Sequence, residues 1–158
     1  IENVLIHHQD LTDIEVFILG QASFNLRSQH VKVITDLITA DEVALQGGSS
    51  TQELALLSKK LIEKATSSKT YYLGVYVGSS FFHNIAKIRS LKLLALKILN
   101  EIFDDNSDIN LEKPLLRIVA LTHYEGWTLY DRHSNMLRNL TAVASSYIGG
   151  ADYVQSSG

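Results

Sequence analysis

Apolar residues recur at the three- and four-residue spacing of an amphipathic helix in three stretches of the chain. The clearest stretch covers about residues 80–103, and its predicted buried stripe is Ile85, Ile88, Leu91, Ala95, Ile98 and Ile102. A second helix is predicted at about 50–65, with an apolar face of Leu54, Leu57, Leu61 and Ala65. A third is predicted at about 134–148, with one face made of Met136, Leu140, Val143 and Tyr147.

Residues that favour helix ends mark the boundaries of these segments. Ser50 with Glu53 three residues later matches a capping box, which satisfies free amides at a helix start. Gly149-Gly150 predicts a left-handed stop after the third helix. The polar residues 104–108 end the long helix and predict a solvated loop.

Short runs of β-forming residues separate the helices. The strongest are residues 71–77 and 116–122, with weaker candidates at 32–38 and 4–7 and a short last strand at 151–155. Residues 11–27 are ambiguous, and a helix at about 11–20 is favoured. Because strands and helices alternate, the fold class is expected to be α/β, with right-handed crossovers and a parallel sheet covered by helices.

Length and composition limit the kinds of protein to which this chain could belong. A chain of 158 residues fits one domain, and a net charge of −3 favours neither nucleic acid nor an anionic membrane surface. The absence of cysteine excludes disulfides and thiolate chemistry. Apolar runs are too short to span a bilayer, and the first 20 residues do not resemble a secretory signal. A soluble, cytoplasmic protein is therefore expected.

Several apparent sites have simpler explanations. His7 and His8 are adjacent on a predicted strand and point to opposite faces, so a shared metal ion is disfavoured. The segment 47–50 (Gly-Gly-Ser-Ser) lacks both nucleotide-binding glycine patterns and is better explained as a strand-to-helix turn. The segment 131–133 (Asp-Arg-His) begins like the D-x-H-x-x-G sequence of cobalamin-binding domains. Because Met136 stands where glycine is needed, this similarity is attributed to chance.

The segment 122–127 is the best candidate on residue chemistry alone. It contains His123, Tyr124 and Trp127 and follows a predicted strand, where functional residues of parallel α/β folds gather. These side chains could stack on a ligand and hydrogen-bond it, or they could close the mouth of a barrel. Both interpretations remain open, and no serine elbow or catalytic triad is recognisable.

Four ordered motifs resemble the barrel domain of the methylmalonyl-CoA mutase family. Residues 81–98 resemble its F-F-x-E-I-A-K-[LI]-R helix, and residues 44–55 resemble its E-x-G-A-x-x-x-Q-E-L-A turn. Residues 127–138 are similar to W-x-L-T-x-Y-D-x-x-x-N-M-L-R, and residues 149–152 match G-G-A-D. The resemblance spans about residues 31–158.

The resemblance implies a (β/α)₈ TIM-type barrel through which a CoA ester is threaded. Such a barrel needs about 250 residues, and only about five strands can be counted here. Residues 1–158 are therefore expected to form a single domain, the C-terminal part of the mutase barrel, without a cobalamin-binding domain. The reaction implied for the family is the interconversion of methylmalonyl-CoA and succinyl-CoA with adenosylcobalamin.

Two departures from the family pattern point to its small, non-catalytic subunit. The arginine that meets the substrate carboxylate is replaced by Val119, and Arg117 lies roughly 7 Å away along the same strand face. Gln155 replaces the catalytic histidine and cannot become cationic. No residue is therefore predicted to be catalytic.

The same resemblance implies what remains of the site and what binds elsewhere. A degenerate substrate pocket would involve His123, Tyr124, Trp127 and Gln155. No cofactor or metal is expected on this chain. Adenosylcobalamin would be held by a large catalytic partner subunit in a heterodimer, and self-association of this chain is plausible. The alternatives are an acyl-CoA-binding or scaffold barrel without mutase activity, and an active mutase with another acyl preference.

Overall fold

A computed structural model describes residues 4–10, 13–19, 31–34, 36–65, 70–104, 114–123 and 127–156. The elements in chain order are β1 (Val4–Asp10), β2 (Asp13–Leu19), β3 (Val31–Ile34), β4 (Leu37–Ile38), α1 (Asp41–Ala44), α2 (Ser50–Lys64), β5 (Thr70–Val77), α3 (Phe81–Asp104), β6 (Leu115–Thr122), α4 (Arg132–Gly149) and β7 (Tyr153–Gln155).

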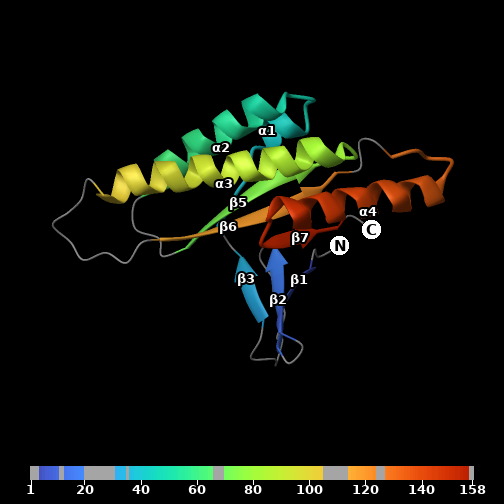
Figure 1. The fold of residues 1–158 in the computed structure, drawn as a ribbon, viewed down its shortest axis with the longest axis horizontal. Coiled ribbons are helices and arrows are strands. Elements are labelled where there is room, and N and C mark those ends of the chain that lie inside the picture. The colour runs from blue at the N-terminus through green and yellow to red at the C-terminus, as the bar shows by residue number, and fades with distance from the viewer. Residues whose placement is uncertain are drawn as a thin grey trace.

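The main sheet has four parallel strands in the order β4-β5-β6-β7. Helices α2, α3 and α4 lie on one face of this sheet, with α3 between the other two (Figure 1). Parallel strands that alternate with helices confirm the α/β prediction and correspond to part of a TIM-type barrel. Within the described residues the barrel is not closed.

The core lies between the helices and the sheet. Strands β5 and β6 direct alternate residues toward the helices, and those residues are buried: Tyr71, Leu73, Val75, Val77, Leu116, Ile118 and Ala120. The predicted stripe of α3 meets them, with Ile88, Leu91 and Ala95 fully buried and Ile98 and Ile102 partly buried. The apolar face predicted for α2 is confirmed by buried Leu57 and Leu61.

A smaller apolar cluster covers the opposite face of the sheet. Val119 and Leu121 of β6 pack there with Tyr153 and Ile34, and the Tyr72 ring lies 6.4 Å from that of Tyr153. In a closed barrel this face would be the interior. Apolar packing therefore fills the side of β6 that the family resemblance associates with substrate.

The predicted helix at residues 11–20 is wrong. Residues 13–19 of this segment form β2, which pairs antiparallel with β1 and parallel with β3 in a separate three-stranded sheet, and residues 11, 12 and 20 lie outside the described part of the chain. Ile14, Val16 and Ile18 alternate along the sequence with a period of two and are β-branched, and this pattern favours a strand. The single strand predicted at 32–38 is divided into β3 and β4, which belong to different sheets.

The face predicted to be apolar on α4 is not the face that is buried. Met136, Leu140 and Tyr147 are 69%, 63% and 79% exposed, and the buried residues are Ala142, Ser145, Ser146 and Gly149. Small residues allow α4 to approach α3 closely, since a Cβ on Gly149 would lie 3.1 Å from Ile88 Cβ. Hydrophobic periodicity identifies the large side chains and misses such a contact.

The predicted start of α2 and the predicted end of α4 are both observed. The capping box at the start of α2 lies one residue earlier than predicted. The capping box of α2 uses Ser49 and Gln52 instead of Ser50 and Glu53, because Ser49 is the extended residue that precedes the helix. Gly150 ends α4 in the left-handed conformation, with φ of 88°. Of the predicted loop at 104–108, residues 105–108 lie outside the described part of the chain.

Candidate functional site

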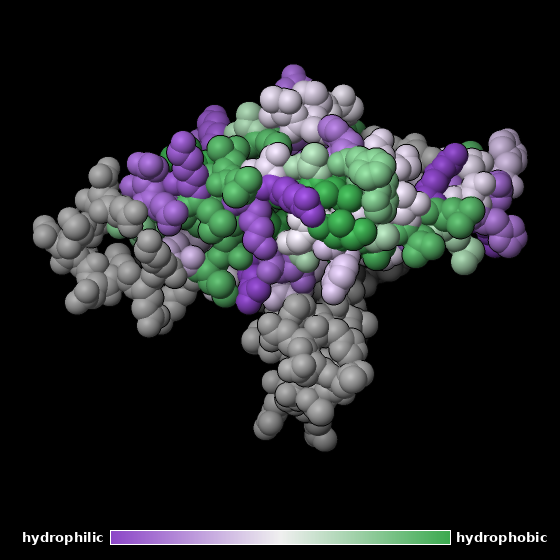
Figure 2. Space-filling model, in the orientation of Figure 1, coloured by the Kyte–Doolittle hydropathy of each residue, from purple (hydrophilic) through white to green (hydrophobic). Residues whose placement is uncertain are grey.

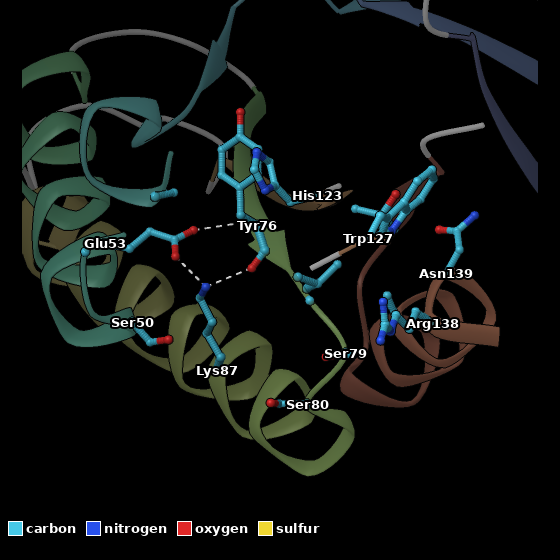
Figure 3. A pocket seen from close by; sticks show the side chains of 16 residues that line it. Ser50, Glu53, Tyr76, Ser79, Ser80, Lys87, His123, Trp127, Arg138 and Asn139 are labelled. Carbon is cyan, nitrogen blue, oxygen red and sulfur yellow. Dashed lines mark hydrogen bonds and ion pairs between the residues drawn. The ribbon is translucent and has the colours of Figure 1, made fainter. Parts of the chain in front are cut away.

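A cavity of about 320 Å³ opens at the carboxyl ends of β5 and β6, and residues of α2, α3 and α4 line it (Figure 3). Active sites of parallel α/β barrels occupy this end of the strands. The residues that line the cavity are Ala44, Gly48, Ser50, Glu53, Tyr76, Val77, Gly78, Ser79, Ser80, Lys87, Thr122, His123, Trp127, Arg138, Asn139 and Ala142.

Glu53 and Lys87 form a buried ion pair at one wall of the cavity. Their side chains are 3% and 8% exposed, and both also bind the backbone of one residue, Tyr76. The Tyr76 amide donates to Glu53 Oε1 at 2.9 Å, and Lys87 Nζ donates to the Tyr76 carbonyl at 2.8 Å (Figure 3). We call these four groups the Tyr76 clamp.

The clamp completes the hydrogen bonding of β5 where its neighbouring strand has ended. Strand β4 pairs with β5 only at Tyr72 and Leu73. The Val77 carbonyl accepts from the His123 amide on the β6 side, so the backbone groups of Tyr76 face the β4 side. Side chains from α2 and α3 therefore satisfy backbone groups that would otherwise be buried without partners.

Asn84 fixes the loop between β5 and α3. It is buried, its Nδ2 donates to the Gly78 carbonyl at 2.7 Å and to Ser145 Oγ of α4 at 2.9 Å, and its Oδ1 accepts from the Gly78 amide at 3.4 Å. The loop residues Ser79 and Ser80 line the cavity next to this contact. One amide side chain thus holds the loop and ties it to α4.

His123 and Tyr76 place two rings at the ends of neighbouring strands. The ring centroids are 5.6 Å apart and the planes are nearly perpendicular, at 83°, which is a favourable edge-to-face geometry. The Tyr76 hydroxyl donates to Asp41 Oδ1 at 2.9 Å, so the ring is anchored at its far end. The His123 imidazole is therefore held at the cavity by packing against a fixed neighbour.

Asn135 positions the segment that carries Trp127. Its Oδ1 accepts from the Thr128 amide at 2.8 Å and its Nδ2 donates to the Thr128 carbonyl at 2.7 Å, so the asparagine of the N-M-L-R motif holds this backbone at two points. Trp127 reaches the cavity from this segment, and Arg138, one turn after Asn135 on α4, reaches it as well (Figure 3).

The side chains of the cavity suit recognition of a small polar or anionic group. They combine a guanidinium, an imidazole, serine hydroxyls and an indole in a cavity at the lower end of the size range of ligand sites. Ser50 of the lining also forms a hydrogen bond through its Oγ with Nε2 of His83, at 2.7 Å. No cluster of three or more potential metal ligands occurs among the residues that were described.

Two of the four predicted pocket residues, His123 and Trp127, line the cavity. Gln155 lies on β7 opposite Leu121, away from the lining, and Tyr124 lies outside the described residues. Sequence reasoning missed Glu53, Lys87 and Arg138. A signal was present for Glu53, which stands one turn before Leu57 on the apolar face of its helix, where a buried carboxylate requires a partner.

Val119, which aligns with the family's arginine, and the nearby Arg117 lie on the face of the sheet away from the helices. Val119 is fully buried in the apolar cluster. Arg117, two residues earlier, donates from Nη1 to Asp152 Oδ1 at 2.8 Å, and this hydrogen bond raises the pKa of its guanidinium. Asp152 also accepts from the Ile118 amide at 2.8 Å, so the aspartate of the G-G-A-D motif joins β6 to the start of β7.

The segment 131–133 forms the start of α4. The Asp131 carboxylate caps α4 by accepting from the amides of His133 and Ser134, and it also accepts from the Ser134 hydroxyl. The similarity to D-x-H-x-x-G therefore has a structural explanation as a helix start.

No helix in the described part of the chain is long and apolar enough to cross a membrane. Comparison with curated proteins found no match. A sequence profile described as methylmalonyl-CoA mutase matches residues 62–157, more than half of the chain, and includes α3, β6, α4 and β7. With its parallel strands and its cavity at their carboxyl ends, this chain belongs to the methylmalonyl-CoA mutase family.

Proposed function

We propose that this chain is a small, non-catalytic subunit, or part of one, of an adenosylcobalamin-dependent methylmalonyl-CoA mutase. The observation that carries the proposal is that β6 presents no accessible cation at Val119 or Arg117. Val119 stands at the position of the substrate-binding arginine and is buried among apolar side chains, and Arg117 is engaged by Asp152. A substrate carboxylate needs a cation that is accessible, and neither position supplies one.

Gln155 supports the same proposal. It stands in place of the family's catalytic histidine, and a neutral amide stabilises developing negative charge on a thioester carbonyl less well than a cationic imidazole. On this proposal the reaction, the bound adenosylcobalamin and its radical chemistry belong to a large catalytic partner, and the complex works in the cytoplasm. The role of this chain is to pack against that partner.

The test is a turnover assay with methylmalonyl-CoA and adenosylcobalamin. The chain alone should form no succinyl-CoA, and a catalytic chain of the same enzyme should gain activity or stability when this chain is added. A Gln155→His variant is the matched control, because restoring the imidazole without a cation at Val119 should leave the chain inactive. Turnover by the unmodified chain alone would refute the proposal.

The second candidate is an acyl-CoA-binding barrel without mutase activity, and the cavity at His123, Trp127 and Arg138 favours it. Calorimetry with methylmalonyl-CoA distinguishes the two functions. Saturable binding that Trp127→Ala weakens would support a binding protein. Absence of heat exchange would remove this candidate and leave the packing role.

A further inference from the structure

A serine hydroxyl and an imidazole are hydrogen-bonded beside the cavity. Ser50 Oγ lies 2.7 Å from His83 Nε2, a separation within the range of a nucleophilic serine and its base. Ser50 is the first residue of α2 and lines the cavity, and His83 is the third residue of α3 and is exposed to solvent. The proposed function uses neither residue, and we call them the Ser50–His83 dyad.

The Tyr76 clamp fixes the spacing of the dyad. On α2, Glu53 follows Ser50 by three positions. On α3, Lys87 follows His83 by four positions. Residues at these spacings lie on the same face of a helix, so the dyad and the buried ion pair are neighbouring contacts between the same two helices (Figure 3). The serine and the imidazole are therefore held in position by rigid elements.

The start of α2 supplies hydrogen-bond donors next to the hydroxyl. Ser49 is the N-cap, and its Oγ accepts from the Gln52 amide at 3.3 Å. The amides of Ser50 and Thr51 lie in the first turn and have no acceptor within the helix. They point out of the helix start, where the helix dipole favours negative charge. The amide of a nucleophile and the amide that follows it are suited to stabilise the oxyanion of a tetrahedral intermediate.

We propose that the Ser50–His83 dyad transfers the acyl group of short carboxylic esters to water. Nε2 of the neutral His83 takes the proton of the Ser50 hydroxyl while Oγ attacks the carbonyl carbon and the C=O electron pair moves to oxygen. As this intermediate collapses, the bond to the leaving alcohol breaks and the imidazolium gives the alcohol the proton. Water then attacks the acyl-serine with His83 as base, which releases the carboxylic acid and restores the hydroxyl. This activity is separate from the mutase reaction and does not depend on the proposed function.

The size of the cavity limits the acyl group. Its volume of about 320 Å³ lies at the lower end of the range for ligand sites. Ala44 and Gly48 line it together with Ser50, and these small residues leave room for a carbonyl carbon beside the hydroxyl. An acetyl ester, p-nitrophenyl acetate, is therefore a suitable probe.

Acylation of Ser50 is the direct test. The probe should release a burst of about one p-nitrophenolate per chain before slower turnover. Mass spectrometry of the protein and its peptides during turnover should locate one acetyl group at Ser50. Ser50→Ala should abolish the burst and this label, whereas Ser90→Ala, which changes an exposed serine of α3, should retain both. A label only at other residues, or a burst that survives Ser50→Ala, would overturn the proposal.

The role of the imidazole is tested in the same assay. His83→Gln should slow the burst by about a hundredfold or more, the usual contribution of a general base. His133→Gln is the matched control, because His133 is also exposed near a helix start but does not line the cavity. Circular dichroism checks the folding of each variant, and Ser50→Ala leaves the capping box of α2 intact. If His83→Gln is acylated at the wild-type rate, the hydrogen bond only joins α2 to α3 and the proposal is wrong.

Discussion

Single residues at the cavity are positioned by contacts that combine charge with backbone hydrogen bonding. In the Tyr76 clamp, Glu53 and Lys87 neutralise each other and also bind the amide and carbonyl of the same strand residue. A buried pair of this kind contributes little net stability compared with apolar packing, but removing one member leaves an uncompensated charge. The clamp therefore makes the sequence intolerant of single changes at these positions.

Lys87→Met should lower the free energy of unfolding by about 3–5 kcal/mol, because Glu53 would remain buried without its partner. Urea denaturation measures the loss. The double variant Glu53→Leu/Lys87→Met should lose less than the sum of the two single variants, since no charge is then left unpaired. Lys59→Met, which removes the exposed pair with Glu63, is the control and should change stability by no more than about 0.5 kcal/mol. A similarly small effect for Lys87→Met would contradict the role of the clamp.

Asp131 gives the stability of α4 a dependence on pH. The Ser134 hydroxyl and the amides of Ser134 and His133 hold the pKa of this carboxyl below its ordinary value of 3.8. Because the pKa is lower in the folded state, the ionised carboxyl stabilises the fold fully at pH values above its ordinary pKa. This contribution is lost as the pH falls through the pKa of the folded state.

The variant Asp131→Asn should therefore keep the helix cap at pH 7 but not titrate. Melting temperatures between pH 7 and pH 3 measure the difference. The wild type should lose more stability than Asp131→Asn as the pH falls below about 4. Parallel curves for the two proteins would show that the carboxylate does not contribute through its charge.

At the scale of elements, α4 ends at a position that only a flexible backbone occupies easily. Gly150 has φ of 88°, and a Cβ there would meet no atom within 4 Å, so any cost of a side chain comes from the backbone conformation. Arg89 and Lys92 of α3 donate to the carbonyls of Ile148 and Gly150 at this end. The end of α4 and the packing of α3 are thus stabilised together.

Gly150→Ala should lower the free energy of unfolding by about 1–2 kcal/mol, the cost of a left-handed conformation for a residue with a Cβ. Gly150→Asn should lose less, because asparagine adopts this conformation more readily. Gly78→Ala is a matched control, since that glycine is equally free of neighbours and has no left-handed φ. Thermal denaturation compares the three. Equal losses at Gly78 and Gly150 would exclude the backbone explanation.

For the whole molecule, the sequence was sufficient to predict a helix or strand where one local pattern of residues dominated. The long stripe of α3 and the β-rich runs of β5 and β6 predicted their elements and the parallel sheet correctly. The prediction was wrong for the buried face of α4, where the contact depends on small residues, and for β2, where short apolar runs suit either a helix or a strand. His123 and Trp127 were found because loops after parallel strands carry sites. Glu53 and Lys87 were missed, because residues 34 positions apart meet only in the folded chain.

The short β4 has a mechanical consequence for the cavity. Because β4 ends before Tyr76, the end of β5 is held by two helices through side chains and not by a neighbouring backbone. A displacement of α2 relative to α3 therefore pulls on Tyr76, whose ring packs against His123. The positions of α2 and α3 are therefore coupled to the position of the His123 imidazole. A partner that shifts these helices from outside would also move the wall of the cavity.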